Sequence, residues 1–244
     1  MGGSFEVDRV LQNTSGAVDE LAFQAEQKIK ATANYFHNLV INGTSASSGA
    51  GYVVNTFDGL KKLLSGTSNE ITSEVQITTA AELTSNYNAF LDELDSFLTV
   101  LDGTPSMLLM NSKMLTKLRG AARRAGYYDR SKDDFGRYVE TYNGIPLLDA
   151  GKYYNGNATV DAVADTAATS GAYGTSEIYA VCLGLDGFHG ISPTGTGVIN
   201  SYMPDLSAPG AVKKGEVELV AGVALKNTLK AAVLKGIATA PKTT

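Results

Sequence analysis

Three acidic residues close together could carry general acid–base chemistry. Asp92, Glu93 and Asp95 fall within four positions, and paired carboxylates can donate and accept a proton at one reacting bond. They lie, however, in a segment whose apolar residues repeat with helical spacing, so that charged residues on its other side would face water. The simpler interpretation is a solvated helix face.

Two other groups could bind or catalyse. His189, between Phe188 and Gly190, could act as a base, but no serine, cysteine or aspartate motif accompanies it, so we favour a structural role. Asp133 and Asp134, beside Arg137, could bind a cation. We favour a surface loop that forms salt bridges across an interface between subunits.

The strongest charge feature is a predicted helix with five cations in residues 113–124: Lys113, Lys117, Arg119, Arg123 and Arg124. Nucleic-acid binding is one interpretation of such a helix. No aromatic residues alternate with these cations to stack on bases, so pairing with acidic neighbours or with water is favoured. We take Lys113, Lys117, Arg119, Arg123, Arg124, Asp133, Asp134 and Arg137 as candidate subunit-interface residues.

Composition and motifs exclude several classes of function. Neither phosphate-binding pattern, GxxxxGK[ST] or GxGxxG, is present. His37 and His189 are far apart and Cys182 is the only cysteine, so we expect no metal, cofactor or internal disulfide. The net charge of −5 argues against a dedicated nucleic-acid binder. No apolar run reaches the roughly 20 residues of a membrane helix, and no secretory signal is seen, so we expect a soluble protein.

The elements that must position these residues can be predicted from periodicity. Residues 4–11 alternate like a strand, and residues 17–41 carry one apolar stripe of a long helix that ends at Asn42-Gly43. Thr79 and Glu82 have capping-box spacing before a second long helix, with Asp102-Gly103 at its end.

The middle and the end of the chain contain several strand signals. Residues 107–110 suit a buried strand, and Asn111 or Ser112 can cap the basic helix. Residues 137–141 and 145–148 read as strands joined by a turn at Asn143-Gly144. Residues 153–174 are predicted to be a variable surface loop, and the strands expected after it are 178–183, 188–192, 217–225 and 229–237.

An ordered set of motifs runs along almost the whole chain and resembles the major capsid protein of tailed bacteriophages. The motifs in chain order are SFEVDRVL (4–11), FDGLKKLL (57–64), LLMN (108–111), DDFGR (133–137), YNGIPLL (142–148), GFHGISP (187–193) and VELVAGVALKNTLKAAVLKGI (217–237). Each motif alone is weak. Their common order makes the resemblance specific.

The resemblance implies an α+β subunit with the HK97-like capsid fold. Residues 1–56 and 206–244 would form the peripheral domain with its spine helix at 17–41, and residues 57–205 the axial domain. Family members ordinarily carry an N-terminal arm and a long hairpin, the E-loop, before the spine helix, and only about sixteen residues precede it here. The arm and the E-loop are therefore expected to be missing, and these residues alone are expected to fold but assemble poorly.

The function that the resemblance implies is a structural one: a subunit without catalytic activity that self-assembles into an icosahedral shell around double-stranded DNA. The implied partners are copies of the chain, in pentamers and hexamers, with scaffolding, portal or decoration proteins. The implied locations are the virion and, during assembly, the host cytoplasm. Two alternatives stay open: an encapsulin-type compartment subunit around a cargo enzyme, and a small α/β enzyme that uses Asp133, Asp134 or His189.

Overall fold

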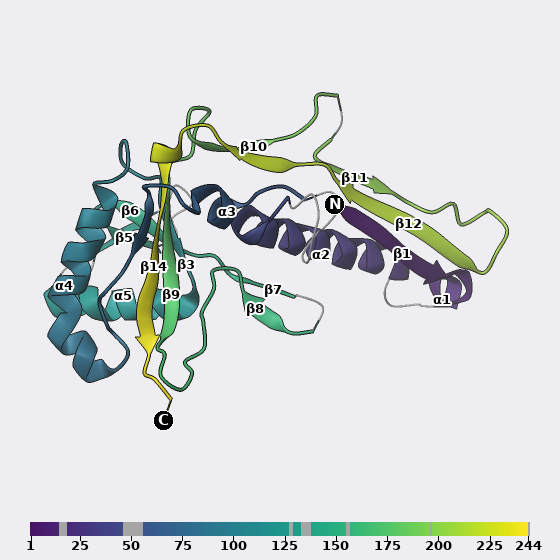
Figure 1. Cartoon of the computed structure of the whole chain (residues 1–244). Coiled ribbons are helices and arrows are strands. Elements are labelled where there is room, and N and C mark those ends of the chain that lie inside the picture. Colours follow the sequence, from purple (N-terminus) through teal and green to yellow (C-terminus); the bar gives the residue numbers. More distant parts are fainter. Residues whose placement is uncertain are drawn as a thin grey trace. The chain divides into compact units, whose positions relative to one another are not determined.

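The computed structural model divides the chain into two compact units (Figure 1). It describes residues 1–14, 19–45, 56–126, 129–132, 138–154, 157–195 and 197–243. The first unit contains Met1–Gly59 and Gly190–Val223, and the second contains Leu60–His189 and Ala224–Thr244. None of the helices described is both long and apolar enough to cross a bilayer.

The first unit is a three-stranded antiparallel sheet with one long helix packed on it. The strands are ordered β1 (Gly2–Asp8), β12 (Val212–Leu219) and β11 (Ile199–Tyr202). Burial alternates strictly along β12, as expected for a sheet with one covered and one solvated face. The covered face forms a small core of Phe5, Val7 and Val217 with Ala25 of α2 (Glu20–Asn42).

The long helix begins later than the sequence predicted. Asp19 caps α2, since its side chain accepts a hydrogen bond from the Ala22 amide at 3.2 Å. The amide of Gly43 donates to the carbonyl of Leu39 and ends the helix close to the predicted stop. The predicted start, residues 17 and 18, lies outside the described residues.

The strand predicted over residues 4–11 was wrong in its second half. Strand β1 ends at Asp8, and residues Arg9–Thr14 form the short helix α1. The Asp8 carboxylate accepts a hydrogen bond from the Val10 amide at 2.7 Å. This local bond satisfies an amide at the start of the turn and so favours helix over a continued strand.

The second unit is built on a seven-stranded sheet with two packed helices. The strand order is β2-β14-β9-β3-β6-β5-β4. Its strands are β2 (Glu70–Thr72), β3 (Met107–Met110), β4 (Asp129–Lys132), β5 (Tyr138–Tyr142), β6 (Ile145–Asp149), β9 (Gly174–Val181) and β14 (Ala231–Ala240). The helices are α3 (Leu60–Leu64), α4 (Ala80–Leu98), α5 (Ser112–Ala125) and the short 3-10 turn η1 (Thr228–Lys230). The chain passes from one unit to the other after Gly59, within β10 (Phe188–Ile191) and within β13 (Gly222–Leu225).

Large apolar residues of both helices and the central strands form one core. Phe90, Leu94 and Phe97 of α4 are almost fully buried, together with Met114 and Leu118 of α5. These residues form one cluster with Leu108, Met110, Ile178 and Leu234 of the sheet. Burial of such a cluster is the main force that holds α4 and α5 to the sheet.

Most predicted helix ends and turns of the second unit are confirmed. Thr79 caps α4 in a full capping box, in which Thr79 Oγ1 accepts from the Glu82 amide at 3.2 Å and Glu82 Oε2 accepts from the Thr79 amide at 3.2 Å. Asn143 and Gly144 take φ of 48° and 78° between β5 and β6, as a tight hairpin turn requires. Helix α4 ends at Leu98, before the predicted Asp102-Gly103 stop.

The division of the chain differs from the expected one at its C-terminal end. Residues 224–244 belong to the second unit, because β14 pairs with β9 of its seven-stranded sheet, and Figure 1 shows these two strands side by side. Residues 190–205 belong to the first unit, because β11 pairs with β12. The burial pattern explains the split: β12 alternates, whereas β14 is buried on both faces over most of its length.

The segment predicted to be a variable surface loop is partly ordered. Strands β7 (Lys152–Tyr154) and β8 (Thr159–Asp161) form a hairpin in the second unit, and Ala162 and Val163 after it are fully buried. Residues 166, 167 and 169–172 are exposed, as expected for a surface loop. The prediction is therefore wrong for the hairpin and for the two buried residues after it.

A glycine in β12 accommodates the largest side chain of the small core. Phe5 and Gly215 are direct partners across β1 and β12. A Cβ atom at position 215 would lie 2.4 Å from Cζ of the Phe5 ring, which is 7% exposed. The ring therefore needs the space that glycine leaves.

We expect Gly215→Ala to lower the free energy of unfolding by about 1–3 kcal/mol, because the ring must leave its place in the core. Urea denaturation followed by circular dichroism measures the change. Gly190→Ala is the matched control, because its nearest atom would be a backbone oxygen at 3.9 Å. Equal stability of the two variants would show that the Phe5 ring does not depend on Gly215.

Candidate functional site

The basic helix α5 is held by its own sequence pattern on the core of the second unit. Met114, Leu115, Leu118 and Ala121 face the core. Asn111 caps the helix, and its side chain accepts a hydrogen bond from the Met114 amide at 2.8 Å. This arrangement leaves the cations on the outer side, as the sequence predicted.

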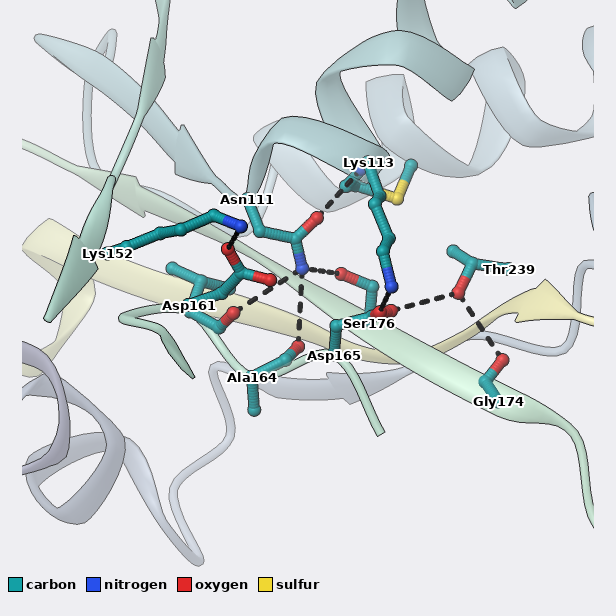
Figure 2. Close-up of polar contacts among 11 residues, drawn as sticks. Asn111, Lys113, Lys152, Asp161, Ala164, Asp165, Gly174, Ser176 and Thr239 are labelled. Carbon is teal, nitrogen blue, oxygen red and sulfur yellow. Dashed lines mark hydrogen bonds and ion pairs between the residues drawn. The ribbon is translucent and has the colours of Figure 1, made fainter. Parts of the chain in front are cut away.

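Three of the five cations are paired within the subunit. Lys113 forms an ion pair with Asp165, which raises the pKa of the lysine (Figure 2), and Arg119 forms one with Glu140. Lys117 donates to the backbone carbonyls of Ile77 and Thr78 at 2.8 and 2.6 Å. Burial lowers the pKa of Lys117. These cations therefore fix α5 to neighbouring segments of its own unit.

Arg123 and Arg124, at the C-terminal end of α5, have only neutral partners among the residues that the structure describes. Arg123 Nε donates to the carbonyl of Arg119 at 3.3 Å. Arg124 donates through Nε to Thr84 Oγ1 at 3.1 Å and through Nη1 to the carbonyl of Gly120 at 2.9 Å. Both side chains are exposed. Their positive charge complements the helix dipole, and no carboxylate in the described parts of the chain neutralises it.

The remaining interface candidates, Asp133, Asp134 and Arg137, lie outside the described residues. Their role as interface residues stays a prediction, as does that of the five cations of α5.

The sequence did not predict the buried amide network around Asn111, although it predicted that this residue could cap the helix. Figure 2 shows the Asn111 amide reaching from α5 toward β9 and the segment after β8. Its Nδ2 donates to Ser176 Oγ at 2.8 Å and lies 3.4 and 3.5 Å from the carbonyls of Val163 and Ala164. Asn111 and Ser176 are both fully buried, so each bond forms away from competing water.

Two ion pairs flank this network. Lys152 pairs with Asp161 at 3.5 Å across the β7–β8 hairpin. Asp165 forms an ion pair with Lys113 of α5, and its Oδ1 lies 3.4 Å from the Thr239 hydroxyl of β14. The network connects four segments of the second unit. Because Asn111 and Ser176 are fully buried, the network acts as a structural joint.

The acidic residues of α4 mostly bind neighbouring segments. Glu93 accepts from the Ser73 hydroxyl at 2.6 Å and from the Glu74 amide at 3.3 Å. Asp95 accepts from the Tyr142 hydroxyl at 2.8 Å and from Asn143 Nδ2 at 3.0 Å. Asp92 and Asp95 are exposed, as expected for a solvated helix face, whereas Glu93 is half-buried. The carboxylate of Asp92 has no partner among the described residues.

Asp92 and Asp95 lie at a hollow of about 490 Å³ that we call the acidic hollow. It is lined by Asn88, Leu91, Asp92, Asp95, Thr141, Tyr142, Asn143 and Gly144. The lining contains no histidine and no cysteine. No group of three or more potential metal ligands occurs anywhere in the described parts of the chain.

His189 and Cys182 remain isolated from any catalytic arrangement in the described residues. Nδ1 of His189 lies 3.3 Å from the carbonyl of Gly187, two residues away. Burial raises the pKa of the Cys182 thiol, which keeps it protonated and unreactive.

Residues 4–145 match the model of the SU10 major capsid protein family. The match covers more than half of the 244 residues, and the chain therefore belongs to this family. The family match makes the chain a structural subunit of a capsid. None of the curated proteins compared with the chain matches it.

Solved structures share the fold at low sequence identity. The SrpI encapsulin of Synechococcus elongatus PCC 7942 has a TM-score of 0.71 at 15% identity, over 100% of this chain and 75% of that chain. The putative capsid protein of an E. coli CFT073 prophage has a TM-score of 0.61 at 12% identity, over 98% and 76% of the two chains. The capsid of a native GTA particle has a TM-score of 0.58 at 15% identity, over 98% and 72%. The expected α+β, HK97-like capsid fold is thereby confirmed.

We expect Asn111→Asp to lower the free energy of unfolding by about 3 kcal/mol at pH 7, because it places an ionised carboxylate against two carbonyls in a buried site. A buried carboxyl holds its proton to higher pH than an unfolded one. The loss of unfolding free energy relative to the wild type should therefore grow as the pH rises above about 4 and shrink below it. Denaturation curves from pH 4 to 8 measure it.

Asn34→Asp makes the same chemical change on an exposed face of α2 and serves as the control. If Asn111→Asp lowers the free energy of unfolding no more than this control does, the role assigned to the buried amide is contradicted.

Proposed function

We propose that the chain is the repeated wall subunit of an icosahedral phage capsid that assembles itself around a double-stranded DNA genome. The observation that carries the proposal is the match of residues 4–145 to a major capsid protein family. Pentamers and hexamers of this chain would form the wall. Many modest contacts per subunit can give a stable closed shell without any strong single contact.

The charge distribution supports a wall around DNA rather than a tight DNA binder. The net charge is −5. Of the five cations of α5, Lys113 and Arg119 form ion pairs with carboxylates of their own subunit, and Lys117 donates to two of its backbone carbonyls. A surface that binds DNA firmly needs clustered, free lysine and arginine to displace counterions. A wall of this composition would enclose a polyanion without holding it in place.

A subunit without catalytic activity is part of the proposal. Glu93 and Asp95, the acids that could transfer protons, are engaged in hydrogen bonds to neighbouring segments. These bonds hold the segments at Ser73–Glu74 and Tyr142–Asn143 against α4. They support a structural role for the two carboxylates.

The proposed partners follow from the shell. Copies of the chain are the main partners, and scaffolding, portal or decoration proteins would join them during or after assembly. The subunit would assemble in the host cytoplasm and remain in the virion.

A second function, an encapsulin-type compartment around a cargo enzyme, rests on one observation. The SrpI encapsulin has a TM-score of 0.71 with this chain. The two functions share a wall and differ in what the wall encloses.

Negative-stain electron microscopy of the complete gene product that carries these 244 residues tests the proposal. We expect closed shells of uniform diameter, because every subunit repeats the same contacts. Nuclease treatment followed by extraction should recover protected DNA from shells assembled in phage-producing cells. Shells that enclose a specific protein and no DNA would instead favour the compartment, and a gene product that stays monomeric at all concentrations would contradict both.

A further inference from the structure

The second unit carries two surface clusters of opposite charge that its own fold does not bring together. The first is the acidic hollow. The second is Arg123 and Arg124, which we call the arginine pair. We propose that the arginine pair of one copy binds in the acidic hollow of a second copy, an inference that rests on the proposed shell function.

The acidic hollow presents carboxylate oxygens in a defined position. Tyr142 and Asn143 both donate to Oδ1 of Asp95, whereas Oδ2 accepts no hydrogen bond from a described residue. Two fixed donors orient this carboxylate before any partner arrives. Asp92, one turn earlier on α4, adds a second carboxylate without a described partner.

The chemistry of this lining favours a guanidinium as the occupant. Arginine presents five donors in a planar fork that matches carboxylate oxygens, and it is weakly hydrated compared with an ammonium. A volume of about 490 Å³ accommodates side chains of this size. The neutral oxygens of Asn88, Thr141 and Asn143 can accept the remaining donors.

The arginine pair has the matching properties. Both side chains are exposed, and their described acceptors are backbone carbonyls and one hydroxyl. A carboxylate from a partner could therefore form an ion pair with either arginine in addition to these hydrogen bonds.

The two clusters lie too far apart to pair within one subunit. Arg124 is bonded to Thr84 in the second turn of α4, whereas the hollow extends to Asp95 near the end of that helix. Eight residues of helix separate Thr84 from Asp92, the nearer carboxylate of the hollow, which is about 12 Å along the axis. Since both clusters sit on the same rigid core, only a second copy can bring an arginine pair to a hollow, and complementary charge of this kind sets the register of an interface.

A charge swap tests the contact. Asp92→Arg and Arg123→Asp change exposed residues that form no ion pair with any described residue of their own subunit, so each variant should fold with a normal melting curve. Each single change places like charges together and should weaken self-association of the complete gene product roughly tenfold or more. The variant with both changes restores opposite charges and should regain most of the wild-type association.

Analytical ultracentrifugation gives the dissociation constant, and negative-stain microscopy gives the yield of shells. Lys62→Glu is the control, because it makes the same kind of charge reversal at an exposed lysine of α3 outside both clusters. The dissociation constant of this control should stay within twofold of the wild-type value.

Single variants that associate like the wild type, or a double variant as defective as the single ones, would overturn the contact even where shells form. Association that depends on the swap without closed shells would support the contact and contradict the shell function. A wild-type chain that never self-associates would overturn both.

Discussion

The buried amide of Asn111 is the joint on which the arrangement of the second unit depends. Asn111 Oδ1 accepts a hydrogen bond from the Met114 amide and so caps α5. Asn111 Nδ2 donates to Ser176 of β9 and to the Val163 carbonyl in the segment after β8. Because all of this occurs out of contact with water, each bond is costly to lose. The joint fixes the start of α5, and the burial of its apolar face on the core places the cations on the outer side.

The same helix explains how a strongly charged surface can belong to a structural protein. Lys113, Lys117 and Arg119 reach acceptors in their own unit. Arg123 and Arg124, at the end of α5, are exposed and have only neutral acceptors among the described residues. Charge on this subunit thus serves first to fix its own fold. The charge that remains is concentrated in small patches, which suits contacts that repeat many times in a shell.

Local sequence signals predicted much of the fold. The Thr79–Glu82 capping box, the strand before Asn111 and the Asn143-Gly144 turn each depend on residues a few positions apart. The helix at Arg9–Thr14 was missed because one side-chain bond from Asp8 outweighs a weak strand pattern.

Long-range features could not be predicted from one sequence. The partners of Asn111 lie 52 to 65 residues away, and no local pattern marks them. The place of β14 beside β9 likewise depends on pairing between distant segments, although burial on both faces was visible as an apolar run. Among the interface candidates, the basic helix was predicted from the sequence. Which of its cations form ion pairs within the subunit could not be predicted.

The decisive measurement is a cryo-electron microscopy reconstruction of particles assembled from the complete gene product. We expect a closed wall made of repeated copies, into whose density both units fit without change of fold. Particles whose wall lacks this chain, or a chain found only as an internal or separate component, would contradict this expectation.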